Sequence, residues 1–218
     1  MTTSTLGRNR PFAQIPHRPL IGFRPVGEHL PSMDDDALTD ALHRACAGDK
    51  TGFAALWRAL NPAVLRYLTV VTGDAAEDVA SETWLQATRD LHRFTGDLTS
   101  FRRWLFRIAR HRGIDERRRA DRRPTPAEIP EPAAPDAATE ALHGHQTAWA
   151  LRMVGTLPPD QAEAVMLRVV IGLDVATTAH ILGKRPGAVR VAAMRGLRRL
   201  AGHPQVRAQR DPQPAEEV

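Results

Sequence analysis

The sequence has a single cysteine and no long apolar run. Because Cys46 stands alone, the chain forms no intrachain disulfide and no zinc site built from several cysteines. No apolar stretch approaches the roughly 20 residues of a membrane-spanning helix, and the N-terminus lacks the apolar core of a signal peptide. These absences exclude a disulfide scaffold and membrane insertion, and they predict a cytoplasmic protein.

Lysine is also rare, because Lys50 and Lys184 are the only two lysines among 30 basic residues. The 25 acidic residues leave a formal net charge of +5, which favours a polyanionic partner such as nucleic acid. A GC-rich genome produces the same arginine bias without any such partner. The clustering of the arginines therefore has to carry the prediction.

Two segments rich in proline divide the 218 residues. Residues 1–33 hold five prolines, spaced too closely for a helix of three turns. Residues 124–140 hold five prolines and four acidic residues but no basic one, which is typical of an extended linker. The predicted organisation is a disordered leader (1–33), a first domain (34–123), a linker (124–140), a second domain (141–203) and a disordered tail (204–218).

Apolar residues recur every three or four positions in both domains, and no segment shows the alternation of a β-strand. In the first domain the pattern includes Leu38, Leu42 and Ala45, and then Phe53, Leu56, Trp57 and Leu60. It resumes after the linker near Leu142. The predicted fold is all-α, with two small helical domains that have separate cores and are joined by a flexible linker.

One predicted helix, from Asp74 as N-cap to near Phe94, has two chemically different sides. The apolar side is expected to consist of Ala80, Trp84, Thr88 and Leu91. The opposite side carries Asp78, Glu82, Gln86 and Arg89. This acidic to polar stripe is either a solvated helix face or a docking surface for a basic partner.

The strongest local pattern, from Leu173 to Leu200, is that of a helix-turn-helix. A short helix, 175–182, is followed by Gly183, and glycine favours the left-handed conformation that ends helices. A second helix begins at Pro186. Its buried seam is predicted at Val189, Ala193, Leu197 and Leu200. Two short helices with a glycine in the turn predict DNA binding in the major groove.

The second of these helices is basic throughout. Six basic residues and no acidic one lie between Lys184 and Arg199. Arg190 and Arg195 are the candidates for contacts with base edges, because arginine pairs bidentately with guanine. A contact with phosphate alone is the alternative for each of them.

The order and spacing of several short motifs resemble the extracytoplasmic-function sigma factors of the sigma-70 family, over about residues 50–202. Residues 76–85, AEDVASETWL, match the family pattern of acidic residues followed by a hydrophobic helix. The family pattern downstream is matched by Phe94, Gly96, Phe101, Trp104-Leu105, Ile108-Ala109, Asp115 and Arg117 to Arg119. Leu157-Pro158 and the helix-turn-helix match in the second domain.

This resemblance implies a sigma factor that binds core RNA polymerase and directs promoter-specific initiation, recognising the minus-35 duplex and melting the minus-ten element. The implied partners are promoter DNA, the clamp helices of the largest polymerase subunit and its flap, and an anti-sigma factor or other regulator. The residues implied to bind core polymerase are Asp78, Glu82 and Gln86. Those implied to bind minus-ten DNA are Phe94, Thr95, Gly96, Asp97, Ser100, Arg103, Arg107, Arg110, His111, Arg117 and Arg118. Those implied to bind minus-35 DNA are Thr177, Lys184, Arg185, Gly187, Ala188, Arg190, Val191 and Arg195.

The segment from Phe94 to Ser100 is similar in place to the family loop that captures a base flipped from the minus-ten element. Extruding a base costs a few kcal/mol of free energy. Binding in a pocket, with stacking on aromatic or arginine faces, compensates for this cost. Ten arginines lie between Arg102 and Arg123. The helix that carries them is expected to bind the phosphate backbone of the melted region. Phe101 and Trp104 lie on the apolar seam and are predicted as core residues.

The sequence departs from the family at a few positions. Ser81 stands where relatives commonly have Gln, His111 where they have Asn, and residues 175–178 replace a more acidic helix start. The main alternative function is a stand-alone helix-turn-helix repressor, which would bind a palindrome as a dimer without polymerase. Neither reading is enzymatic, and no catalytic residue, cofactor or metal is predicted. His143 and His145, with Glu140 nearby, could suggest a metal site. Two positions apart on a helix, however, their side chains point in different directions, so a metal site is not predicted.

Overall fold

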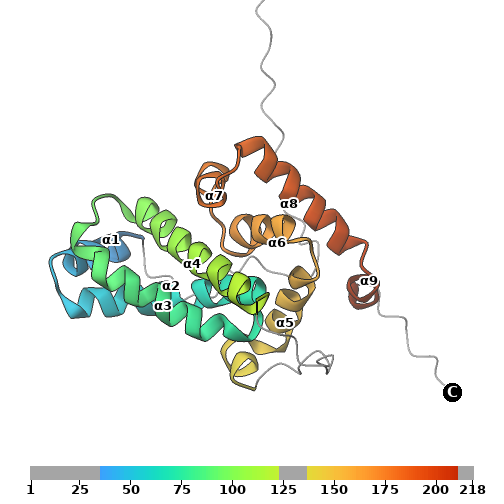
Figure 1. The fold of residues 1–218 in the computed structure, drawn as a ribbon, viewed down its shortest axis with the longest axis horizontal. Helices are drawn as coiled ribbons and strands as arrows, with labels where there is room; N and C mark the ends of the chain where they lie inside the picture. Colours follow the sequence, from blue (N-terminus) through green and yellow to red (C-terminus); the bar gives the residue numbers. More distant parts are fainter. Residues whose placement is uncertain (1–34, 123–136, 211–218) are drawn as a thin grey trace, which may run out of the picture.

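The structure is a computed structural model that describes residues 35–122 and 137–210. Its helices form two adjoining groups (Figure 1). The first group contains α1 (Asp35–Cys46), α2 (Lys50–Thr72), η2 (Gly73–Ala75), α3 (Ala76–Asp90), η3 (Leu91–Arg93) and α4 (Leu98–Ala120). The second contains α5 (Ala137–Gly155), α6 (Pro159–Val165), η4 (Met166–Val170), α7 (Val175–Leu182), α8 (Pro186–Ala201) and α9 (Pro204–Arg210). Within these two described ranges there is no strand, which confirms the all-α prediction.

In the first domain, α1 packs closely against α2 because of a glycine. A Cβ atom on Gly52 would lie 2.7 Å from the carbonyl oxygen of Ala41, so only glycine permits this approach. Leu56 and Leu60 of α2 are buried as predicted. Trp57, which the apolar pattern placed beside them, is instead 43% exposed.

The helix predicted from Asp74 to Phe94 is divided into η2, α3 and η3. Gly73 has a positive φ of 60° and turns the chain after α2, so Asp74 lies inside a 3-10 turn and does not cap α3. Thr88 was expected on the apolar side but is exposed, and its hydroxyl donates to the Trp84 carbonyl. Thr83 and Ala87 are buried in its place.

In the second domain, the helix-turn-helix forms as predicted. Asp174 is the N-cap of α7 and accepts a hydrogen bond from the Thr177 backbone N–H at 2.9 Å. Gly183 follows α7 with φ 64° and ψ 32°, the left-handed conformation expected there. Helix α8 begins at Pro186 and buries Val189. These local signals lie within a few residues of one another, so tertiary contacts do not change them.

The predicted boundaries of the second domain need two corrections. Helix α5 begins at residue 137, so the last four positions assigned to the linker are helical. The tail was predicted to be disordered from residue 204, yet residues 204–210 form α9. Val206 explains this helix, because its side chain is 2% exposed and packs into the core. Residues 1–34, 123–136 and 211–218 lie outside the description, so the predicted leader and most of the linker do too.

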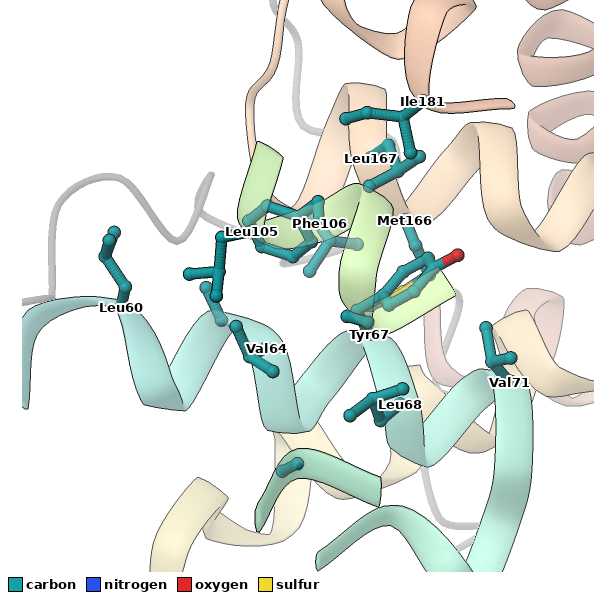
Figure 2. Close-up of a cluster of buried hydrophobic side chains, with 14 of the residues drawn as sticks. Leu60, Val64, Tyr67, Leu68, Val71, Leu105, Phe106, Met166, Leu167 and Ile181 are labelled. Atoms are coloured by element: carbon teal, nitrogen blue, oxygen red, sulfur yellow. The ribbon is translucent and has the colours of Figure 1, made fainter. Parts of the chain in front are cut away.

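The two domains share one hydrophobic cluster, whereas the sequence predicted separate cores. Figure 2 shows Met166, Leu167 and Ile181 of the second domain beside Tyr67 and Phe106 of the first. Each of these five side chains is at most 2% exposed. Helix α6 packs against α2, and α7 packs against α4. The domains are therefore in direct contact, and Glu163 makes polar contacts across the same interface.

Candidate nucleic-acid and polymerase interfaces

A cavity of about 370 Å³ opens where the segment between η3 and α4 meets the first turns of α4. Its lining residues are Asp90, Arg93, Phe94, Thr95, Ser100, Arg103, Trp104, Arg107 and His180. The aromatic part of the wall belongs to a cluster of rings, in which the Phe94 ring lies 5.4 Å from Trp104 in a tilted contact and 5.5 Å from Phe101 in an edge-to-face contact, between centroids. The cavity is thus part aromatic and part basic.

The short segment before α4 shapes this cavity. Asp97 caps α4 and accepts a hydrogen bond from the backbone N–H of Ser100 at 2.7 Å. Hydrogen bonding by the side chain and backbone of Ser100 lowers the pKa of Asp97, so the carboxylate stays ionised. Gly96 has φ 145°, and a Cβ there would lie 3.0 Å from the Ser100 Cβ. A side chain at position 96 would therefore strain the loop.

Chemically, such a cavity suits a flipped nucleobase. Aromatic faces stack on any base, and arginines at the rim bind the phosphates on either side of it. Arg93, Arg103 and Arg107 supply three guanidinium groups to the wall. The cavity has room for one planar ring and a polar edge to orient it.

Several residues predicted to bind minus-ten DNA meet at this cavity. Five of them line it, namely Phe94, Thr95, Ser100, Arg103 and Arg107, while Gly96 and Asp97 hold the loop. His111 and Arg118 are exposed further along α4. Arg110 and Arg117 differ from the rest, because both form ion pairs with Glu163 of α6.

Sequence reasoning missed some of the lining residues. Trp104 was predicted as a core residue but is only partly buried and lines the cavity. Its three-residue spacing from Phe101 is the core spacing of a helix, so the pattern alone did not separate the two roles. His180 reaches the cavity from α7 in the other domain, and no local signal could have indicated this.

The stripe on α3 divides into an exposed part and a supporting part. Asp78 and Glu82 are exposed. Gln86 is half-buried, and its amide oxygen accepts two hydrogen bonds from Arg112 of α4, at 2.9 and 3.1 Å. Arg112 also lies 3.7 Å from Glu82. Gln86 thus joins α3 to α4 rather than standing free on the surface.

An apolar side chain accompanies this stripe. Leu85 lies one turn after Glu82 and is 53% exposed. Leu85 thus adds an apolar side chain to the same face of α3 as Asp78 and Glu82. No local pattern singles out Leu85, because one apolar residue on a polar face does not alter the helical periodicity.

Helix α8 and its N-cap expose several basic side chains. Arg185, Arg190 and Arg195 are exposed together with Val191. Gly187 and Ala188 are exposed in its first turn, and a Cβ on Gly187 would meet no atom within 4 Å. This glycine is therefore not needed for packing within the chain.

Two residues predicted to bind minus-35 DNA have partners inside the domain. Lys184 forms an ion pair with Asp160 of α6. Thr177 is 7% exposed, and its hydroxyl donates to the Asp174 carboxylate at 2.5 Å. The Thr177 side chain is thus buried and bonded to Asp174, the N-cap of α7.

Other kinds of site are not found in the described part of the chain. No three His, Cys, Asp or Glu side chains gather there as metal ligands. The side chains of His143 and His145 lie outside the description. None of the described helices combines the length and apolar character that spanning a membrane requires.

Both domains match known family models. Residues 53–123 match Sigma-70 region 2, and residues 147–200 match Sigma-70, region 4. The ECF RNA polymerase sigma factor ShbA of Streptomyces griseus is 35% identical over 185 residues, covering 77% of this chain and 97% of that protein.

Solved structures support the fold. CnrH in complex with the cytosolic domain of CnrY has a TM-score of 0.55 at 21% identity, covering 78% of this chain and 96% of that one. The sigma factor RpoE in complex with the anti-sigma factor NepR, from Bartonella quintana, has a TM-score of 0.52 at 21% identity, covering 69% and 94%. With both family regions in order and a full-length relative of this similarity, the chain belongs to the sigma-70 family as an ECF RNA polymerase sigma factor, a DNA-binding initiation factor that directs core RNA polymerase to promoters.

Proposed function

We propose that the cavity between η3 and α4 captures an unpaired base of the minus-ten element and so stabilises the melted promoter. The cavity itself carries this proposal, because it combines an aromatic wall with three arginines. Phe94 and Trp104 supply the stacking surface, and Arg103 and Arg107 bind the adjoining phosphates. His111 and Arg118 extend the basic surface along α4.

The second domain binds the minus-35 duplex through α8. Arg190 and Arg195 project from this helix toward base edges, and Arg185 contacts phosphate at its N-terminus. The open space around Gly187 lets the groove approach the first turn. Val191 is exposed between these arginines and offers an apolar contact for a thymine methyl group.

Core polymerase binds the exposed part of the α3 stripe. Asp78 and Glu82 face the clamp helices of the largest subunit, and Leu85 is the apolar anchor beside them. Gln86 contributes to polymerase binding without contacting polymerase, because its hydrogen bond with Arg112 joins α3 to α4. The second domain meets the flap of the polymerase.

The protein acts in the cytoplasm, where it positions DNA and polymerase and catalyses no covalent step itself. A regulator of the anti-sigma class is a further partner. The fold relative RpoE is described in complex with an anti-sigma factor, and this chain's fold is suited to the same class of regulator.

A bulky side chain placed in the cavity tests whether the cavity captures a base. Thr95 is exposed and lines the cavity, so Thr95→Trp occupies the space for the base without changing any charge. Promoter-directed transcription with core polymerase should fall by at least about tenfold on duplex DNA. Without base capture, nothing compensates for the few kcal/mol that unstacking the base costs. A template whose minus-ten region is already unpaired should recover part of this loss.

Thr99→Trp is the matched control, since Thr99 is exposed in the first turn of α4 but does not line the cavity. This variant should transcribe like the wild type. Equal activity of the Thr95→Trp and Thr99→Trp proteins on duplex promoters would show that the cavity captures no base.

A further inference from the structure

Two apolar side chains are exposed among the basic residues of α8. Val191 is 40% exposed and Met194 is 43% exposed. Among the described residues of the second domain, no other large apolar side chain is comparably exposed. Keeping apolar area in water costs free energy, and a partner that covers it recovers this cost. The pair therefore needs an explanation that the basic residues around it do not supply.

Both side chains project from the outward side of α8. The opposite side packs on α6 (Figure 1) and buries Val189, Ala193, Gly196 and Leu200. A Cβ atom on Gly196 would lie 2.8 Å from a Cγ atom of Val165 in α6, so this close packing fixes which side of α8 faces outward. With 3.6 residues per turn, Val191 lies opposite the buried seam, and Met194 is its neighbour three positions on.

The backbone in front of the pair is bare. Gly187 lies one turn before Val191, and a Cβ atom there would meet no atom within 4 Å. Ala188 beside it is exposed and small. Glycine lowers the stability of a helix relative to alanine, and packing within the chain does not require it at this position. The first turn of α8 thus permits a partner to approach closely enough to contact Val191 and Met194.

The charges around the pair identify the chemistry of this partner. Arg190, Arg195 and Arg198 are exposed on the same helix, and no acidic residue lies between Lys184 and Arg199. An apolar protein surface would leave these guanidinium groups without anionic partners. The major groove of duplex DNA supplies both features, because phosphates border it and the C5 methyl group of thymine projects into it. Duplex DNA is therefore the partner that fits.

The spacing of the two side chains sets how many bases they reach. Three residues of α-helix rise about 4.5 Å along the axis, and successive base pairs of a duplex are about 3.4 Å apart. Val191 and Met194 thus lie at the right separation for two adjacent base pairs. The short valine needs its methyl group close to the helix, whereas the flexible methionine adapts to one that lies further away.

We propose that Val191 and Met194 together read the methyl groups of two thymines on adjacent base pairs of the minus-35 element. This inference rests on the proposed function of α8 as the reader of that element, and it extends the single apolar contact of Val191 to a pair. The minus-35 element of this sigma factor accordingly contains two adjacent A·T pairs, in addition to the guanines that arginine side chains bind.

Deoxyuridine tests the proposal, because uracil pairs with adenine as thymine does and lacks only the methyl group. The full chain with core polymerase first selects a minus-35 sequence from a duplex library randomised in that element. Each thymine of the selected element, on either strand, is then replaced singly by deoxyuridine. Competition with a fluorescein-labelled promoter duplex measures the affinity. Replacements at two adjacent base pairs should each weaken binding about fourfold, or about 0.8 kcal/mol for one buried methyl group.

Substitutions in α8 assign each methyl group to its side chain. Val191→Ala should abolish the effect of deoxyuridine at one of the two base pairs, and Met194→Ala should abolish it at the other. Both side chains are exposed, so circular dichroism should show unchanged helix content and thermal midpoints. Arg190→Ala is the matched control, since it weakens binding by the same helix but removes no apolar contact. Its fourfold ratio between thymine and uracil duplexes should persist.

The outcomes separate this inference from the function on which it rests. Equal affinity of the wild type for every uracil duplex, with a minus-35 sequence still selected, would overturn the methyl readout alone and leave the pair to a protein partner. An effect of deoxyuridine that both alanine variants retain would overturn it too, as would a selected element without two adjacent A·T pairs. If the library yields no minus-35 preference at all, the proposed function of α8 fails together with the inference.

Discussion

At the scale of single residues, the partners of each arginine decide what it can bind. Arg112 is used inside the first domain, where it joins Gln86 and Glu82 to α4. Arg110 is held by a carboxylate from the other domain. Arg190 and Arg195 are exposed on α8. Similar residues on amphipathic helices thus differ in whether a group inside the chain holds the guanidinium, and we expect the exposed ones to bind DNA most readily.

The exposed arginines of α8 should read the minus-35 sequence. Arg190→Ala and Arg195→Ala should each cost about 1–3 kcal/mol on the best promoter if the side chain pairs bidentately with a guanine. Discrimination between minus-35 variants should relax at one base pair in each case. Transcription from a panel of promoters with single minus-35 changes, assayed with core polymerase, measures both effects.

Arg199→Ala controls for the loss of one positive charge from the same helix, since Arg199 is exposed in its last turn. This variant should weaken all promoters by a similar small factor. A uniform loss across the panel for Arg190→Ala and Arg195→Ala as well would assign those two side chains to phosphate alone.

At the scale of elements, aspartate caps position the helices that carry the interfaces. Asp49, Asp97 and Asp174 begin α2, α4 and α7, and each accepts a hydrogen bond from a backbone N–H inside its helix. Hydrogen bonding lowers the pKa of all three carboxyl groups. A cap of this kind satisfies a donor that the helix leaves unpaired. The loop at the cavity and the turn before α7 both depend on one.

The cap of α7 predicts a pH dependence. Hydrogen bonding by the Thr177 side chain and then its backbone lowers the pKa of Asp174 in the folded state. Because an unfolded aspartate has a pKa of about 3.9, this cap stabilises the fold fully above that pH. Its contribution is lost as the pH falls through the lower folded value.

Asp174→Asn isolates this contribution, because asparagine caps as well as aspartate but does not titrate. At neutral pH the two proteins should have nearly equal thermal midpoints, whereas Asp174→Ala should cost about 1 kcal/mol. On lowering the pH below about 4, the wild type should lose more stability than Asp174→Asn. Thermal melts followed by circular dichroism at a series of pH values give the comparison, and parallel curves would refute the role of the carboxylate.

At the scale of the whole molecule, the two domains are docked on each other. Helix α7 packs on α4 and α6 packs on α2, and Tyr67 and Phe106 are buried in a core shared by both domains. In the promoter complex, the minus-ten and minus-35 surfaces must reach DNA elements about one and a half turns apart, roughly 50 Å. The predicted linker, shortened to residues 124–136 by the start of α5, would span only about 20 Å as a coil, so we expect polymerase to hold the domains apart.

Assembly with polymerase should depend on the exposed part of the α3 stripe. Asp78→Arg combined with Glu82→Arg should abolish association with core polymerase, because both charges face a basic docking surface. Helix content and thermal stability should remain nearly unchanged, since the Glu82–Arg112 pair is largely exposed and such pairs contribute at most about 1 kcal/mol. Pull-down of core enzyme by the tagged protein measures the association.

Asp115→Arg combined with Asp121→Arg makes the same change of net charge on exposed positions of α4 and the residue that ends it. This double variant should still retain core polymerase in the absence of DNA. Retention of core enzyme by the α3 variant, or its loss from the α4 control, would show that the stripe is not the specific contact.

The sequence by itself determined the features that depend on neighbours along the chain. The helix 175–182, the Gly183 that follows it and the helix start at Pro186 were predicted from the sequence, and all three are correct. Caps, left-handed glycines and helical periodicity act over one or two turns, so they can be recognised from the sequence alone. The family motifs, which are also short and ordered, led to the same two domains.

Tertiary structure alone decided which of these surfaces are free. Arg110 and Arg117 carry the same local signal as the other arginines of α4, yet they pair with a carboxylate 53 and 46 positions away. His180 reaches the cavity from the other domain. Burial of Tyr67 and Glu163 likewise depends on how the domains dock. Such contacts join residues far apart in the chain, and their energy depends on geometry and desolvation that no local pattern encodes.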